Sequence, residues 1–166
     1  MRINVTFSKV PLNTLEEKRE YLKNALGSED VLSHNNVDTS NFLYTTAIDL
    51  SDPHLMIFVA ELHMIMIGYI EAYIYDDVVE IKYVGVVKDY CFIGIGSGLV
   101  NIVEQYAAKK SISTVILDMT RAEKGARAFF HGLGYSSYNE EEPFCEDDLE
   151  HDTDHKYKYR IRKKLV

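Results

Sequence analysis

The chain has little of several residue types that mark large protein classes. It contains two cysteines, Cys91 and Cys145, which are too few for a disulfide framework, and it has no tryptophan. No apolar run approaches the roughly 20 residues of a membrane helix, and residues 1–10 lack the apolar core of a signal peptide. These absences predict a soluble protein of the reducing cytoplasm with no membrane partner.

The chain also has fewer basic than acidic residues. Lys and Arg number 18 against 26 Asp and Glu, which gives a net charge of −8. Binding to a nucleic-acid backbone needs a surplus of positive charge on some face, so the composition argues against that partner. Nine of the acids lie between residues 139 and 154. This segment reads either as a solvated loop or as an acidic lip that attracts a cationic substrate.

The hydrophobic pattern predicts one domain over residues 1–166, because 46% of the residues are hydrophobic and the length suits a single core. Alternating or β-branched runs predict strands, and apolar stripes predict helices. The expected strands are Arg2–Phe7, Leu55–Leu62, Met64–Tyr75, Val78–Val87, Ser113–Met119 and Lys156–Leu165. The expected helices are residues 13–27, the stripe from Ile95 to Tyr106, and Arg121–Gly132, while residues 28–52 read as a second short helix or a loop.

The order of these elements predicts the fold class. Three consecutive strands, with turns at Leu62-His63 and Asp76-Asp77, form an antiparallel meander. The strand, helix and strand that follow imply a parallel pair joined by a right-handed crossover. We therefore expect an α/β fold of the α+β type, with a mixed sheet of six to seven strands and helices on both faces.

A glycine-bearing turn links the third strand of the meander to the central helix. Gly94, Gly96 and Gly98 leave the backbone bare where the helix begins, so its first N–H groups can point at a diphosphate. Such glycines can equally serve only a tight turn and close packing. Gly85, at the end of the preceding strand, predicts a bulge or a close backbone approach.

Two motifs make the chain resemble the GNAT family of N-acetyltransferases over most of its length. The run Cys91-Phe92-Ile93-Gly94-Ile95-Gly96 matches the acetyl-CoA signature Q/R-x-x-G-x-G/A except at its first position, where Cys91 replaces Gln or Arg. Phe129-Phe130-His131-Gly132-Leu133-Gly134-Tyr135 echoes the second signature, F-Y-x-x-x-G-F. Cys91 is either a neutral replacement or, near a helix N-terminus, a thiol of lowered pKa.

The resemblance implies acetyl-CoA as acetyl donor and no metal. The diphosphate would bind the backbone of Phe92, Ile93, Gly94, Ile95, Gly96 and Ser97. The pantetheine arm would add to the free edge of the meander strand like an extra strand, bonded to Val84 and Val86, where this strand splays from its parallel neighbour at Gly85. Phe130 would pack against the cofactor.

The resemblance also implies roles in catalysis. Glu80 stands where some family members carry a catalytic glutamate, and a carboxylate there could take the proton of an ammonium substrate. Phe130 aligns with the tyrosine that protonates the leaving thiolate in many members, and it has no proton to give. The implied partner is a primary amine on a small molecule, peptide or protein, and the family also forms homodimers.

Two other functions remain open from the sequence. One is a non-catalytic acetyl-CoA-binding or interaction domain that has kept the fold. The other is a nucleotide-binding domain, which fits poorly because a meander, and not the first strand of repeated βαβ units, leads into the turn.

Overall fold

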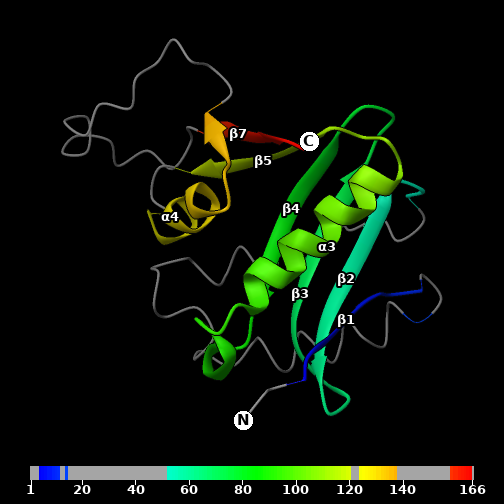
Figure 1. Cartoon of the computed structure of the whole chain (residues 1–166), viewed down its shortest axis with the longest axis vertical. Helices are drawn as coiled ribbons and strands as arrows, with labels where there is room; N and C mark the ends of the chain where they lie inside the picture. The colour runs from blue at the N-terminus through cyan, green and yellow to red at the C-terminus, as the bar shows by residue number, and fades with distance from the viewer. Residues whose placement is uncertain (1–3, 12–13, 15–51, 121–123, 138–157, 166) are drawn as a thin grey trace.

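The structure is a computed structural model that describes residues 4–11, 14, 52–120, 124–137 and 158–165. Seven strands form one sheet in the order β1-β2-β3-β4-β5-β7-β6 (Figure 1). Their bounds are β1 Thr6–Lys9, β2 Leu55–Leu62, β3 Ile65–Ile74, β4 Val79–Val86, β5 Thr114–Thr120, β6 Ser136–Ser137 and β7 Lys158–Lys164.

The sheet is mixed, as predicted. Strands β1 to β4 pair antiparallel, β4 pairs parallel with β5, and β7 pairs antiparallel with both β5 and β6. The meander strands lie within one residue of their expected ends. The turn between β2 and β3 differs by one residue, because His63 and Met64 occupy it with φ of 50° and 66°.

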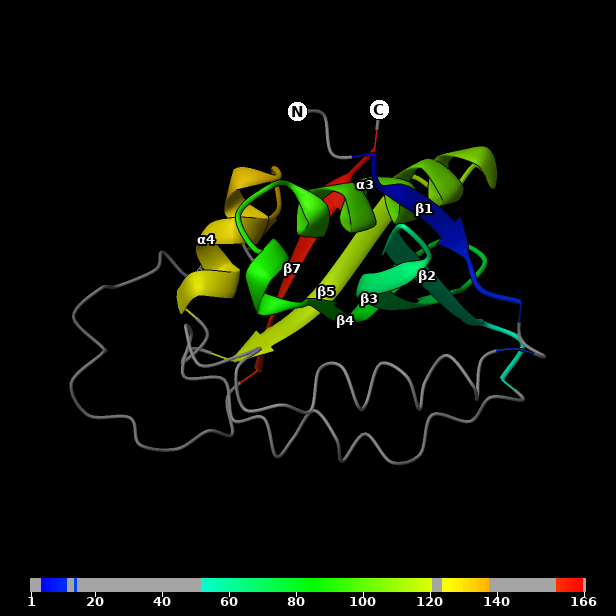
Figure 2. The same ribbon diagram turned by 90° about the horizontal axis from the view of Figure 1, so that it is seen from below.

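Two helices pack on the same face of the sheet, here called the helix face (Figure 2). Helix α3, Ile95–Lys109, crosses β2, β3 and β4, and α4, Lys124–Gly132, lies near β5 and β7. A short 3-10 helix, η2 Lys88–Tyr90, leads into the turn before α3. The helix predicted over 13–27, the segment 28–52 and the acidic segment 139–154 lie outside the described residues, except Thr14 and Asp52.

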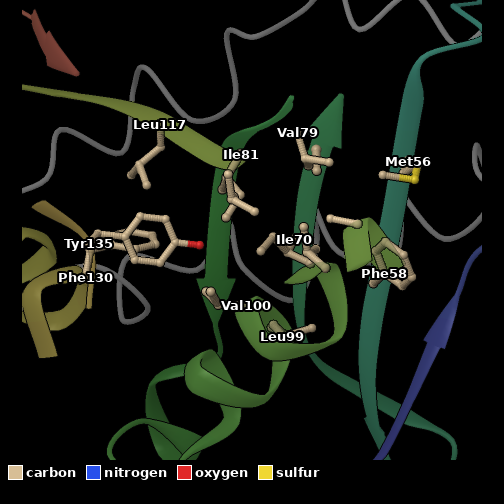
Figure 3. Close-up of a cluster of buried hydrophobic side chains, with 14 of the residues drawn as sticks. Met56, Phe58, Ile70, Val79, Ile81, Leu99, Val100, Leu117, Phe130 and Tyr135 are labelled. Atoms are coloured by element: carbon tan, nitrogen blue, oxygen red, sulfur yellow. The ribbon is translucent and has the colours of Figure 1, made fainter. Parts of the chain in front are cut away.

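Side chains alternate between two buried clusters because successive strand residues point to opposite faces. The helix face carries the larger cluster, with Ile70, Val79, Ile81, Leu99 and Leu117 among its members (Figure 3). The opposite face carries a smaller cluster that includes Ile57, Val59 and Tyr69. No helix in the described part of the chain has the length and apolar character needed to cross a membrane.

Candidate active site

Strands β4 and β5 pair over a short distance and then diverge. Their parallel ladder consists of Val79↔Val115, Glu80↔Ile116 and Ile81↔Leu117, although β4 runs on to Val86. Lys82 is an extra residue in β4, because Glu71 faces Tyr83 while Ala72 faces Ile81. A bulge bends the strand that carries it. The divergence therefore begins at Lys82. The resemblance had placed it three residues later, at Gly85.

The backbone of β4 beyond the bulge offers hydrogen-bonding groups on its outer side. The Val87 N–H donates to the Ile67 carbonyl oxygen at 2.8 Å, so this residue turns its backbone groups toward β3. Backbone groups alternate in direction along a strand. Val86 and Val84 therefore turn theirs away from β3, toward the side on which β5 leaves.

Gly85 has a packing reason of its own. The ring of Tyr83 lies against it, and a β-carbon built at Gly85 would overlap the Tyr83 ring. The same glycine also comes close to β3, since a β-carbon built at Gly68 would lie 2.9 Å from the Gly85 carbonyl oxygen. The predicted close backbone approach is present, whereas the bulge is at Lys82.

The turn before α3 leaves backbone N–H groups without partners inside the helix. Gly94 is the N-cap of α3, with φ of 90°, and no side chain caps the helix. The first intrahelical bond runs from the Gly98 N–H to the Gly94 carbonyl at 2.9 Å, so the N–H groups of Ile95, Gly96 and Ser97 precede the helical ladder. A β-carbon built at Gly94 meets nothing within 4 Å. This geometry fits an anionic diphosphate.

The other two glycines of the turn serve packing. A β-carbon at Gly96 would lie 3.3 Å from the Phe129 ring, and one at Gly98 would overlap the Phe7 ring of β1. The alternative named for these glycines, close packing, is therefore present at Gly96 and Gly98. Phe92 is the most exposed side chain of the turn, at 92%, and has φ of 63°.

Cys91 is a packed thiol. Its Sγ donates to the carbonyl oxygens of Val86 and Val87, each at 3.7 Å. Burial raises the pKa of the Cys91 thiol, and the charge of Asp89 raises it further. The alternative of a thiol with lowered pKa is wrong, and the neutral replacement stands.

Glu80 lies in the part of β4 that pairs with β5, one residue before the last paired residue, Ile81. Its neighbours Val79 and Ile81 both belong to the helix-face cluster, so Glu80 points to the opposite face. Its side chain is only 10% exposed. The ammonium of Lys82 forms an ion pair with Oε1 of Glu80, and Nη2 of Arg160 lies 3.8 Å from the same oxygen.

Sequence reasoning missed the charged residues around Glu80. Arg160 of β7 binds Asp118 of β5 through two bonds, Nε to Oδ1 at 2.7 Å and Nη2 to Oδ2 at 3.0 Å. Arg160 directly precedes Ile161, which belongs to the helix-face cluster, so Arg160 points to the opposite face, as Glu80 does. Its proximity to Glu80 depends on the register of three strands, which no local pattern encodes.

Phe130 lies in the core of the helix face, 3% exposed. Its ring packs edge-on against Phe129 and Tyr135, with centroids 5.0 Å and 5.3 Å apart. Figure 3 shows Phe130 beside Tyr135. Tyr135 donates to Oε1 of Glu104 at 3.0 Å, and Lys163 pairs with the same carboxylate at 2.8 Å. This second network, which the sequence did not reveal, joins α3 to β7.

Comparison with known proteins places the fold. The chain shares its fold with the PaiA N-acetyltransferase from Thermoplasma acidophilum in complex with coenzyme A (17% identity, 98% and 99% of the two chains covered, TM-score 0.62). It also resembles the ribosomal-protein-S18-alanine N-acetyltransferase from Escherichia coli (13%, 98% and 95%, 0.64). A third similar structure is aminoglycoside 6'-acetyltransferase type Ii (18%, 97% and 97%, 0.66).

No curated protein sequence matches the chain at a significant level. The profile of the Acetyltransferase (GNAT) family matches residues 19–135, which is more than half of the chain. This match confirms the resemblance seen in the two motifs. It also confirms that the protein is an acyltransferase and that its acetyl donor is acetyl-CoA. The chain belongs to the GNAT family of acetyltransferases.

Proposed function

We propose that the protein transfers an acetyl group from acetyl-CoA to a primary amine by direct attack, with Glu80 as the general base. The observation that carries this proposal is the position of a buried carboxylate on β4, immediately before β4 and β5 diverge. A carboxylate there faces the side of the sheet opposite α3 and α4. The base and the helix that would hold the cofactor thus lie on different faces.

We assign the cofactor to residues of β4, of the α3 turn and of α4. The backbone of Val84 and Val86 would bond the pantetheine arm on the outer edge of β4, and the N–H groups from Phe92 to Ser97 would hold the diphosphate. Phe130 would contribute apolar packing from the helix face. When bound, acetyl-CoA supplies a thioester whose acetyl group can pass to nitrogen and whose sulfur can leave as a thiolate.

The protein's own part in the chemistry is proton removal and positioning. An ammonium must lose a proton before its nitrogen can attack, and Glu80 would take that proton directly or through one water. Phe130 cannot protonate the thiolate. A thiol has a pKa of about 8.5, so its thiolate leaves near neutral pH without an acid, at a lower rate.

For the acetyl acceptor we propose a chemical class, the primary amines. The similar structures include enzymes named for an alanine of a ribosomal protein and for an aminoglycoside, so this fold serves acceptors of very different size. Peptide N-termini, lysine side chains, polyamines and amino sugars therefore form the panel to be tested.

Thiol release from acetyl-CoA, measured with this panel, tests the proposal. We expect Glu80→Gln to lower turnover about 10²- to 10⁴-fold while leaving acetyl-CoA affinity unchanged in calorimetry. Asp77→Asn is the matched control, because Asp77 is an exposed acid in the turn before β4. Near-normal turnover of Glu80→Gln across the pH range would remove Glu80 from this role.

A further inference from the structure

The carboxylate of Glu80 is held asymmetrically. Both cations that reach it, the ammonium of Lys82 and the guanidinium of Arg160, approach the same oxygen, Oε1. Among the described residues, no hydrogen bond or ion pair reaches Oε2. One oxygen is thus neutralised from two sides, and the other keeps its lone pairs for a further partner.

Arg160 is itself fixed in place. Its two bonds to Asp118 form a bidentate pair, which sets the plane of the guanidinium as well as its position. Asp118 directly follows Leu117, the last β5 residue that pairs with β4. The Asp118–Arg160 pair therefore stands beside the point where β4 leaves the sheet's regular pairing.

The distance between β4 and β7 explains why an arginine is suited to position 160. Strands β4 and β7 are separated by β5, so their backbones are about two strand spacings, or roughly 9.6 Å, apart. A long side chain from β7 can cross that space and still meet a glutamate reaching from β4. A lysine has comparable reach but lacks the planar fork that binds Asp118 through two bonds.

We propose that Arg160 is a positioning residue of the active site: held by Asp118, it fixes Oε1 of Glu80 together with Lys82 and leaves Oε2 as the proton-accepting oxygen. This inference rests on the proposed function of Glu80 as base. In the step, an N–H bond of the substrate ammonium breaks, its electron pair stays on nitrogen, and an O–H bond forms at Oε2. The complete transfer of acetyl to the amine releases one proton to solvent.

The charge environment of Glu80 comes from three strands besides its own. Tyr73 is its register partner on β3, and Glu71 lies two residues away on the same face. Among the described residues, the titratable or charged groups that face Glu80 or lie near it on this side of the sheet are Lys82, Tyr83, Tyr73, Glu71, Asp118, Arg160 and Arg162. Removal of Arg160 subtracts a positive charge and leaves Asp118 without its bidentate partner, so both changes favour protonation of Glu80.

The direct test is a carbon-NMR titration of protein labelled at the glutamate carboxyl carbons, with the Glu80 signal assigned by its loss in Glu80→Gln. In Arg160→Met we expect the titration midpoint of Glu80 to move to higher pH, because a cation 3.8 Å from Oε1 is lost. Lys164→Met, which removes a more distant cation from the same strand, should leave the midpoint unchanged. An equal shift in both variants, or none in either, overturns the proposal.

Kinetics supply the second measurement. The acidic limb of the kcat/KM profile should move to higher pH in Arg160→Met, so its loss of activity is larger at pH 6 than at pH 8, with KM for acetyl-CoA unchanged. Arg160→Lys keeps a cation and should recover part of the loss. Asp118→Asn keeps Arg160 but removes the charge of its bidentate partner, and should shift the limb less than Arg160→Met.

These readouts separate the inference from the function on which it rests. If Glu80→Gln is inactive but Arg160→Met lowers kcat equally at every pH, Arg160 is only structural and the inference fails. If Glu80→Gln turns over normally while the NMR shift is present, the proposed base is wrong although the positioning contact exists. Thermal unfolding of each variant shows whether a loss of activity reflects a loss of fold.

Discussion

The phenol ring of Tyr83 lies directly against Gly85, two residues further along β4. Both residues stand in the stretch of β4 that has left β5, and the ring also packs on Tyr69 with centroids 5.0 Å apart. A β-carbon at Gly85 would overlap the Tyr83 ring and hydroxyl. The ring therefore requires a glycine at this position, beside the edge to which we assign the pantetheine arm.

Gly85→Ala should destabilise the protein by about 1–3 kcal/mol, as expected for overpacking of a well-filled site. Denaturant unfolding measures the change. Gly132→Ala is the matched control, because nothing lies within 4 Å of a β-carbon built there. If Gly85→Ala unfolds at the wild-type denaturant concentration, the Tyr83 ring can move aside and the close contact does not affect stability.

Negative charge at Gly94 should weaken acetyl-CoA binding. Asn and Asp both tolerate the left-handed backbone of Gly94, with φ of 90°, and have nearly the same shape. We expect Gly94→Asp to bind acetyl-CoA at least about tenfold more weakly than Gly94→Asn, through repulsion of the diphosphate. The difference should shrink at high salt, because salt screens exposed charges. Calorimetry that gives equal affinities for the two variants would place the diphosphate elsewhere.

The absence of tryptophan allows an independent measurement of the same site. Phe92→Trp places a single tryptophan in the turn, where the native side chain is almost fully exposed. Acetyl-CoA should protect it from acrylamide quenching. Met64→Trp is the control, since Met64 is equally exposed and also has a positive φ. Protection of both or of neither would contradict the assignment.

Phe130→Tyr should raise turnover modestly and lower stability. The new phenol stands where related enzymes keep their general acid, and it stays protonated below about pH 10, so the gain should hold across the neutral range. Its hydroxyl also enters a core in which Phe130 is 3% exposed, at a cost of about 1–3 kcal/mol if it finds no partner. Turnover per folded molecule and the unfolding midpoint measure the two effects. Lower turnover at every pH would show that the ring serves packing alone.

Tyr135 should make stability fall at alkaline pH. Burial, the charge of Glu104 and the hydrogen bond to it all raise the pKa of Tyr135. In the unfolded chain a tyrosine loses its proton near pH 10, whereas the folded protein keeps it to higher pH. The stabilisation is therefore complete below about pH 10 and is lost as the pH rises above it.

Comparison of the wild type with Tyr135→Phe isolates this contribution. The variant loses the bond to Glu104, worth about 0.5–1.5 kcal/mol at neutral pH. Its stability should then decline less between pH 9 and pH 11 in urea unfolding. Parallel declines in the two proteins would assign the alkaline loss to groups other than Tyr135.

The order of elements was predictable because local patterns encode it. The β-branched runs from Leu55 to Val87 set three strands, the apolar stripe from Ile95 set α3, and Gly94 marked the helix start, each through interactions of residues near in sequence. The glycine turn and the family motifs likewise occupy single short segments. Local sterics and periodic burial determine such features.

The surroundings of Glu80 were decided only by the tertiary structure. Glu80, Asp118 and Arg160 lie on three strands, and their meeting depends on the register of β4 with β5 and of β5 with β7. The bulge at Lys82 and the close packing of the Phe7 ring on Gly98 also arise between distant segments. The sequence by itself determined the three meander strands, the α3 turn and the place of Glu80 on the third of these strands. Packing of distant strands decided which charges hold that base, because a contact between side chains far apart in the chain exists only once the sheet has formed.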